Sequence, residues 1–213
     1  MSKAVIWDFN GTLLDDLAIS LATINELLAE NSLRRLPDAA AYRKVFGFPV
    51  RAYYTRLGFD FEKQPFDRLA ERYMELWHQK EHTAGLTEGA LDTLSAFRAA
   101  GVRQFLLSAT EEQALKAHAA SLGIAEFFEG IYGAADCYGE GKKSAALALK
   151  SVLGETDNVS YIGDTPHDVE IAALFGGKMY YFKGGHQLPP QNLPETIRQA
   201  QTLTEIKEAI LCS

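Results

Sequence analysis

The chain has 213 residues, of which 47% are hydrophobic and 23% are charged, a composition typical of soluble globular proteins and not of disordered ones. Its net charge of -7 disfavours general binding to the phosphate backbone of nucleic acids. No apolar run is long enough to span a membrane. We therefore expect a cytoplasmic protein, a monomer or homodimer, with two reduced thiols, Cys137 and Cys212.

The predicted elements begin with a short apolar run, residues 4–7, which predicts a buried strand. This strand ends in the polar sequence Asp8-Phe9-Asn10-Gly11-Thr12. From about residue 17 to residue 81 the apolar periodicity is helical, interrupted by an aromatic stretch at residues 42–61. Further strands are expected at residues 104–107, 130–132, 159–162 and 178–182, separated by helices at 91–100, 111–122, 144–153 and 169–174, with a last helix from about residue 203.

This alternation of strands and helices predicts βαβ units and a parallel sheet. We expect an α/β fold with a Rossmann-like parallel sheet core, formed by residues 1–14 and 86–213. The helical periodicity directly after the first strand predicts an inserted α-helical cap, formed by residues 15–85.

Polar side chains gather where the predicted strands end, which is where ligands bind in open parallel sheets. They comprise carboxylates, hydroxyls, an amide and two lysines: Asp8, Asn10, Thr12, Ser108, Lys142, Lys143, Asp164, Thr165 and Asp168. Such a set suits an oxygen-rich Mg²⁺ site that holds a phosphoryl group.

Each of these residue types has a chemical reason to be there. A carboxylate such as Asp8 can attack phosphorus and form an aspartyl-phosphate that water then hydrolyses. Because two anions repel each other, a divalent cation must lie between nucleophile and phosphate, and Asp164 can help to hold it. A hydroxyl such as Ser108 and a lysine such as Lys142 can bind the other phosphoryl oxygens.

Four sequence motifs resemble those of haloacid dehalogenase-type hydrolases. The sequence Asp8-Phe9-Asn10-Gly11-Thr12-Leu13 resembles the first motif, and Leu106-Leu107-Ser108-Ala109 resembles the second. The pair Lys142-Lys143 resembles the third motif, and Gly163-Asp164-Thr165 with Asp168 resembles the acidic fourth motif. The helical insertion between the first two is similar to the small cap of phosphoglycolate phosphatase-like members.

The resemblance implies a Mg²⁺-dependent phosphatase that acts on a small phosphorylated metabolite through an aspartyl-phosphate. It implies that Asp8 is the nucleophile and that Asp8, the backbone carbonyl of Asn10, and Asp164 bind Mg²⁺. Asp168 would be a further ligand or a residue that orients the ligands. The expected substrate-binding residues are Thr12, Ser108, Ala109 and Lys142, with Lys143 as the alternative to Lys142.

Asn10 departs from the family pattern, which usually has a second Asp at this position. That carboxyl protonates the leaving alcohol, and Asn has no proton to give at neutral pH. General acid–base catalysis is typically worth about 10²–10⁴ in rate. Alkyl phosphates should therefore react poorly, whereas acyl phosphates, aryl phosphates and phosphoanhydrides need no acid. A slow phosphatase, a phosphate-ligand binding protein without turnover, and a dehalogenase or phosphotransferase of the same fold remain alternatives.

Three further features carry open alternatives. His167 and His186 are each either a surface histidine or the replacement for the missing acid. Ser108 is a phosphate ligand, the N-cap of the helix that begins near residue 111, or both at once. The aromatic stretch is expected to form the core of the cap, with Gly47-Phe48-Pro49 as a candidate substrate-facing loop.

Overall fold

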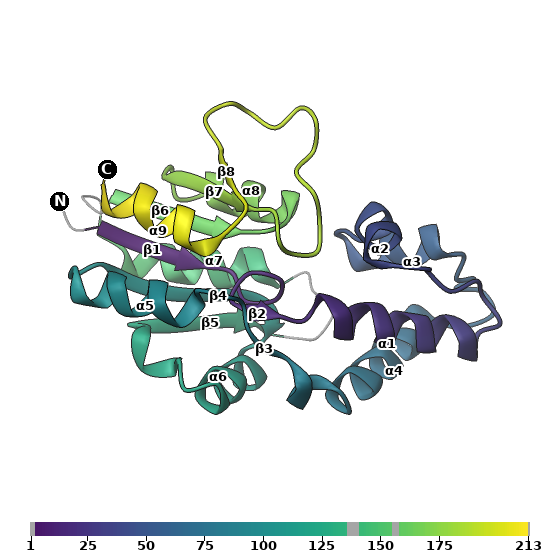
Figure 1. Cartoon of the computed structure of the whole chain (residues 1–213). Helices are drawn as coiled ribbons and strands as arrows, with labels where there is room; N and C mark the ends of the chain where they lie inside the picture. Colours follow the sequence, from purple (N-terminus) through teal and green to yellow (C-terminus); the bar gives the residue numbers. More distant parts are fainter. Residues whose placement is uncertain (1–2, 136–140, 155–157, 213) are drawn as a thin grey trace.

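The computed structural model describes residues 3–135, 141–154 and 158–212. A parallel six-stranded sheet lies at the centre of the larger part of the molecule (Figure 1), with the strand order β5-β4-β1-β6-β7-β8. The α/β fold predicted from the sequence is confirmed. The strands are β1 (Lys3–Trp7), β4 (Arg103–Glu111), β5 (Gly130–Ala134), β6 (Asn158–Gly163), β7 (Lys178–Phe182) and β8 (Arg198–Ala200).

Helices cover both faces of this sheet, and alternate residues of β1 point into the two cores. Val5 and Trp7 lie in one buried cluster, and Ala4 and Ile6 lie in the other, as the period of two along a strand requires. The first cluster is covered by α5 (Ala90–Ala99), α6 (Glu112–Ser121) and α9 (Leu203–Leu211). The second is covered by α7 (Lys142–Val152) and α8 (Pro166–Ala173).

The central position of β1 determines where the site forms. β1 pairs in parallel with β4 on one side and β6 on the other, and the Asp8 backbone N–H donates to the Ile162 carbonyl at 2.9 Å. The carboxyl ends of the three strands therefore meet at one edge of the sheet. Asp8 and Asp164 directly follow β1 and β6, and Ser108 lies in the second half of β4, so this edge brings the three residues near one another.

A helical unit lies to one side of the sheet (Figure 1) and has its own buried cluster. It contains α1 (Leu17–Glu30), α2 (Ala39–Val45), α3 (Val50–Leu57) and α4 (Phe66–His78). Two short strands connect it to the core, β2 (Leu14–Asp15) and β3 (Gly85–Leu86), which pair antiparallel. We propose that this pair marks the boundary of an inserted cap. The aromatic stretch supplies four buried members of the cap cluster: Tyr42, Tyr53, Tyr54 and Phe59.

β4 is longer than the strand predicted at residues 104–107, and the cap of the following helix differs from the expected one. β4 runs to Glu111, and the Glu111 carboxylate caps α6 by accepting from the backbone N–H groups of Gln113 and Ala114, at 3.0 and 2.8 Å. The alternative that Ser108 caps this helix is therefore wrong. The Ser108 hydroxyl instead accepts from the Thr110 N–H at 3.1 Å. Two 3₁₀ turns, η1 (Glu81–Thr83) and η2 (Ala125–Phe127), complete the secondary structure.

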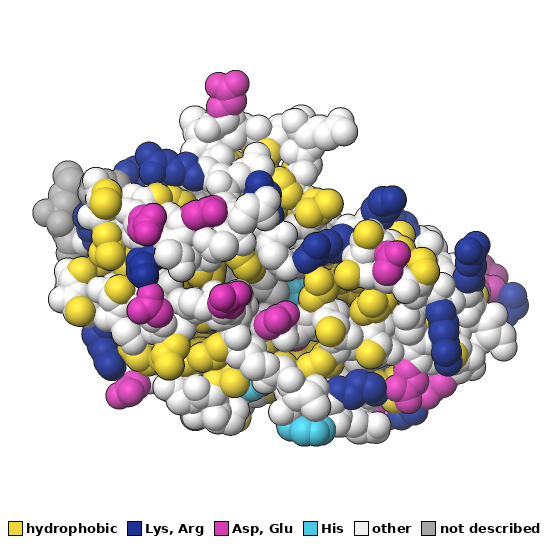
Figure 2. Space-filling view, viewed as in Figure 1, with side chains coloured by type: hydrophobic (Ala, Val, Ile, Leu, Met, Phe, Trp, Pro, Cys, Tyr) yellow, Lys and Arg dark blue, Asp and Glu magenta, His cyan; other side chains and the backbone are white. Residues whose placement is uncertain are grey.

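The surface is mixed in charge. Basic and acidic side chains are interspersed on the face that Figure 2 shows, with hydrophobic side chains between them. Within the described ranges, no helix combines the length and apolar character needed to cross a bilayer. Cys212 is a free, exposed cysteine, whereas Cys137 lies outside the described residues.

Candidate active site

The Asp8 carboxylate lies buried at the end of β1 beside the ammonium group of Lys142. Lys142 stands at the first turn of α7 and contacts both Asp8 and Asp168, the latter at 2.6 Å. Burial alone would lower the pKa of Lys142, but the carboxylates of Asp168 and Asp8 raise it, so the lysine is charged. Lys143 lines a different cavity, so Lys142 is the residue of the pair that can neutralise Asp8 and a phosphoryl oxygen.

Three buried carboxylates converge beside this lysine. Oxygens of Asp8, Asp164 and Asp168 all lie within 4.8 Å of one another. Burial raises the pKa of Asp8 well above its ordinary value, and the neighbouring carboxylates add to this rise. Burial also raises the pKa of Asp164 to about 6. The positive charge of Lys142 does not balance the negative charges of these three carboxylates. Their oxygens therefore fit a hard divalent cation that takes oxygen ligands.

The Asp168 carboxylate already has four hydrogen-bond donors. One oxygen accepts from Lys142 and from the Tyr161 hydroxyl, at 2.6 and 3.1 Å. The other accepts from the Thr165 N–H and hydroxyl, at 3.0 and 2.7 Å, in a capping box that starts α8. Burial would raise the pKa of Asp168, but Lys142 and the Thr165 bonds lower it. Of the two roles expected for Asp168, this geometry favours orienting Lys142 and α8.

The Asn10 side chain is held by partners at both polar atoms. Its amide nitrogen donates to an Asp16 oxygen at 3.0 Å, and its oxygen accepts from the Thr110 hydroxyl at 2.9 Å. The Ser108 hydroxyl donates to the Thr110 oxygen at 3.1 Å, which extends the chain of bonds into the second motif. Asn10 is therefore a fixed, neutral donor to a carboxylate and has no acidic proton.

Asp16 and His186 form a buried ion pair that no local sequence pattern indicates. The His186 Nε2–H donates to Asp16 at 3.0 Å. Burial alone would lower the pKa of His186, but Asp16, Asp164 and Asp8 raise it to about 9. Burial would raise the pKa of Asp16, but His186 and the bonds from Asn10 and Gly11 lower it. Both groups are therefore charged at neutral pH.

His186 is buried, so the interpretation of it as a surface histidine is wrong. Its other ring nitrogen, Nδ1, lies 3.0 Å from the Tyr42 hydroxyl, and its backbone N–H donates to Asp164 at 2.6 Å. Because both ring nitrogens are already hydrogen-bonded, neither is free to protonate a leaving group. The geometry instead makes His186 a connection between Asp16, the acidic cluster and the cap.

Thr12 and Gly11 pack beneath the cluster. The Thr12 hydroxyl is buried and donates to Asp164 at 3.1 Å, so it orients that carboxylate, and its expected contact with substrate remains a prediction. Gly11 has a φ of 73°, and a Cβ there would lie 2.5 Å from Asp164 and 2.4 Å from the His186 ring. Glycine is required for this close approach.

A cavity of about 640 Å³ opens over these groups. Its lining includes Asp8, Asn10, Ser108, Ala109, Lys142 and Asp168, which are residues expected at the site, together with Asp16, Thr110 and His186. The cap contributes Tyr42, Phe46, Phe48, Tyr73, Met74 and Trp77. The candidate nucleophile therefore faces a space that is closed on one side by aromatic side chains of the cap.

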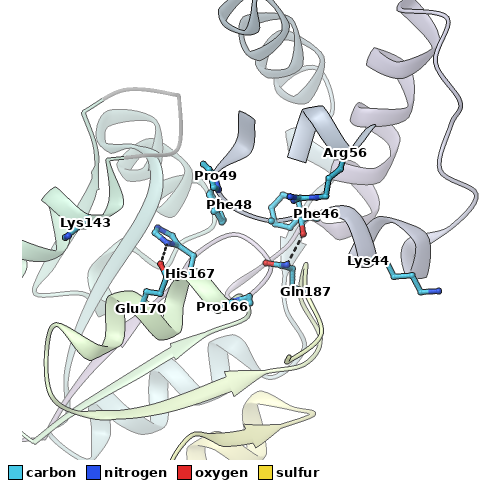
Figure 3. Close-up of a pocket in the computed structure, with 11 residues that line it drawn as sticks. Lys44, Phe46, Phe48, Pro49, Arg56, Lys143, Pro166, His167, Glu170 and Gln187 are labelled. Carbon is cyan, nitrogen blue, oxygen red and sulfur yellow. Dashed lines mark hydrogen bonds and ion pairs between the residues drawn. The ribbon is translucent and has the colours of Figure 1, made fainter. Parts of the chain in front are cut away.

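A second cavity, of about 590 Å³, lies where the cap meets α8, and Figure 3 shows the residues that line it. Phe48 packs against His167, with ring centroids 4.9 Å apart, and Gln187 donates to the Phe46 carbonyl at 2.8 Å. His167 contacts Glu170 at 3.4 Å and lines this cavity, not the one over Asp8. This position does not favour His167 as the missing acid.

Comparison with known proteins bears on the chemistry. The family model described as haloacid dehalogenase-like hydrolase matches residues 5–181. The chain belongs to this family. It is also similar to the phosphoglycolate phosphatase of Rhodospirillum rubrum, with 30% identity over 201 residues that cover 89% of this chain and 83% of the relative. The haloacid dehalogenase-like chain is thus a phosphatase-type hydrolase, as the four motifs predicted.

Solved structures share the fold of this haloacid dehalogenase-like hydrolase over nearly the whole chain. A family member from Streptococcus pneumoniae has a TM-score of 0.79 at 19% identity and covers 98% of each chain. Protein Tyrosine Kinase A of Mycobacterium tuberculosis has a TM-score of 0.81 at 23% identity, with 98% of each chain covered. These likenesses show the fold alone.

Proposed function

We propose that the chain is a Mg²⁺-dependent phosphohydrolase that uses Asp8 as the nucleophile and acts on small phosphorylated substrates with good leaving groups. The observation that supports this proposal most strongly is the convergence of Asp8, Asp164 and Asp168 beside Lys142, because Asp8, Asp168 and Lys142 also line the cavity. Asp8, Asp164 and the Asn10 carbonyl are the expected Mg²⁺ ligands. The cation would offset the charge that separates Asp8 from the phosphate.

In the proposed reaction, an Asp8 oxygen bonds to phosphorus while the bond from phosphorus to the leaving-group oxygen breaks. Lys142 lies beside Asp8 and would hold a phosphoryl oxygen, which stabilises the charge of the transition state. The Ser108 hydroxyl is the expected second phosphoryl ligand, and it would have to turn from Thr110 to donate to substrate. The leaving oxygen departs as an anion because Asn10 cannot protonate it. Water then attacks the phosphorus of the aspartyl-phosphate, and the Asp8 carboxylate is released.

The experiment is a phosphate-release screen of acyl, aryl and alkyl phosphates, with and without Mg²⁺, with Asp8→Asn as the blank. We expect acyl and aryl phosphates to be hydrolysed only with Mg²⁺ and only by the wild-type chain. Among aryl phosphates, kcat/KM should fall steeply as the pKa of the leaving group rises, since no acid assists departure. A shallow dependence, or activity that survives in Asp8→Asn, would contradict the proposal.

A phosphate-ligand binding protein without turnover is the second candidate, and the neutral, fully hydrogen-bonded Asn10 is the observation that favours it. A protein of this kind should show a thermal shift with inorganic phosphate and Mg²⁺ but release no phosphate from any compound. Turnover of acetyl phosphate that requires Asp8 rules this candidate out.

A further inference from the structure

The cap gives the active-site cavity an aromatic and apolar wall. α4 contributes Tyr73, Met74 and Trp77, and the chain that follows α2 contributes Phe46 and Phe48. The Phe46 and Phe48 rings pack with centroids 5.8 Å apart, which fixes their positions against each other. The cavity volume of about 640 Å³ lies within the roughly 300–1,000 Å³ of sites for drug-sized ligands. It has room for far more than a two-carbon acid.

The positive charges of the cavity lining already have carboxylate partners. Lys142 contacts Asp8 and Asp168, and His186 contacts Asp16. Burial lowers the pKa of His118, so its ring is neutral at neutral pH, and His78 lies 2.9 Å from Glu81. Of the residues that the structure describes, no arginine lines this cavity.

Four acidic side chains also line this cavity: Glu71, Glu75, Glu81 and Glu111. Glu71 and Glu75 are exposed and pair with Arg68 and Arg72, at 3.2 and 2.9 Å. Within the described part of the lining, a carboxylate on the substrate would therefore meet no cation that lacks a carboxylate partner. An uncharged aromatic ring would pack against the side chains of the cap. The wall therefore selects against a second negative group on the substrate.

We propose that the substrates are aryl phosphates, in which a phenol without a negatively charged substituent is esterified to phosphate. This inference rests on the proposed function. Two independent features, the aromatic wall and the neutral Asn10, indicate that the leaving group of the substrate is a phenolate. A phenol, like the tyrosine side chain, has a pKa of about 10, against about 16 for water. A phenolate can leave without a proton, whereas an alkoxide needs one.

The atoms balance in two steps. An Asp8 oxygen bonds to phosphorus, the phosphorus–oxygen bond to the ring breaks, and its electron pair leaves on the phenolate. A water oxygen then bonds to phosphorus and the bond to Asp8 breaks, which restores the carboxylate. The two protons of the water end on the phenol and on the released phosphate, so no further reactant is needed.

The test uses three aryl phosphates whose phenols carry para-alkyl chains of similar length and differ little in pKa. They are 4-propylphenyl phosphate, 4-(2-aminoethyl)phenyl phosphate and 3-(4-phosphonooxyphenyl)propionate, with acetyl phosphate alongside. With the full chain and Mg²⁺, we expect kcat/KM for the propyl and aminoethyl compounds to exceed that for the propionate by at least tenfold. Equal rates, or a preference for the propionate, would overturn the inference.

A pair of variants tests the charge argument at one position. Met74 is half-buried in the lining, and Met74→Lys would add a cation of similar length, with Met74→Gln as the neutral control. Met74→Lys should raise kcat/KM for the propionate relative to the propyl compound by at least fivefold, and Met74→Gln should leave this ratio unchanged. If neither variant, with wild-type thermal stability, changes the ratio, the substrate ring does not lie against α4.

The two proposals can fail separately. Hydrolysis of acetyl phosphate that needs Asp8 and Mg²⁺, without hydrolysis of any aryl phosphate, would overturn the aryl inference and leave the proposed function intact. No hydrolysis of any of the four compounds would contradict the proposed function itself.

Discussion

At the scale of single residues, the hydrogen bonds of the Asn10 side chain explain how the site stays ordered in a family member that lacks the usual acid. Asp16 carries a negative charge 3.0 Å from the Asn10 amide nitrogen, so this position needs a donor. A carboxyl at position 10 would have to keep its proton to lie there, because two carboxylates this close share one proton. The surroundings therefore suit either an amide or a protonated acid.

This argument predicts the effect of Asn10→Asp. The new carboxyl should have a raised pKa, act as a general acid, and increase kcat/KM for alkyl phosphates by about 10²-fold or more. Asn192→Asp is the matched control, since Asn192 is exposed and the change in charge is the same. If Asn10→Asp leaves alkyl-phosphate hydrolysis at the wild-type rate, the missing acid is not the barrier.

The ion pair between His186 and Asp16 predicts a pH dependence of stability. The pKa of His186 is raised to about 9 from an ordinary 6.5, so its stabilisation is complete below pH 6.5 and is lost as the pH rises through 9. A shift of this size corresponds to a free energy of unfolding on the order of 3 kcal/mol.

We expect the difference in free energy of unfolding between wild type and His186→Gln to shrink between pH 6.5 and pH 9.5. Urea denaturation of protein freed of metal with a chelator measures this difference. A difference that stays constant over that range would mean that His186 does not carry its charge in the folded state.

At the scale of elements, the loop after β7 links the cap to the core through hydrogen bonds. Arg43 of α2 donates to the carbonyls of Gly185 and Gly184, at 2.8 and 2.6 Å. Tyr42 contacts His186, and Gln187 donates to the Phe46 carbonyl. These bonds hold the aromatic wall over Asp8, and they join segments more than 140 residues apart.

Arg43→Ala should loosen this contact without touching Asp8. We expect KM for an aryl phosphate to rise about three- to tenfold with a smaller change in kcat, because the cap then covers the site less of the time. Arg34→Ala, which removes an exposed arginine elsewhere in the cap, should have no effect. Steady-state kinetics of the two variants measure this effect. Equal KM values for Arg43→Ala and Arg34→Ala would show that the loop after β7 does not contribute to closure of the cap.

The elements that the sequence predicted are those with strong local patterns. The strand β7 was predicted with the bounds observed. The ends of β1, β4 and β6 were predicted to meet because the carboxyl ends of parallel strands lie at the same edge of a sheet. β8 was missed because Arg198–Ala200 has no apolar pattern and becomes a strand only by pairing with β7. Asp16 was missed because its partner His186 lies 170 positions away.

At the scale of the whole molecule, the acidic cluster should link folding to Mg²⁺. The cluster forms only when β1 and β6 pair, so a cation that binds it binds the folded state alone. Mg²⁺ at about 100 times its dissociation constant would add about 2.7 kcal/mol of stability. For a chain of this length that is about 5–10 °C in Tm.

Asp164→Asn should abolish most of this thermal shift, while Asp67→Asn, at an exposed position on α4, should retain it. Without Mg²⁺, Asp164→Asn should be at least as stable as wild type at pH 8, because it removes one of three crowded carboxylates. Differential scanning fluorimetry measures both effects. A full Mg²⁺ shift in Asp164→Asn would place the cation elsewhere.

The reaction path depends on Asp8 becoming phosphorylated, and trapping that intermediate is the most direct measurement. Because Asn10 offers no base to activate water, the aspartyl-phosphate should accumulate when an aryl phosphate and Mg²⁺ are mixed with the protein and quenched in acid. Peptide mass spectrometry should then find one phosphoryl group on Asp8, absent without Mg²⁺ and absent in Asp8→Asn. Turnover with no phosphoryl group on Asp8, or with one on another residue, would contradict Asp8 as the nucleophile.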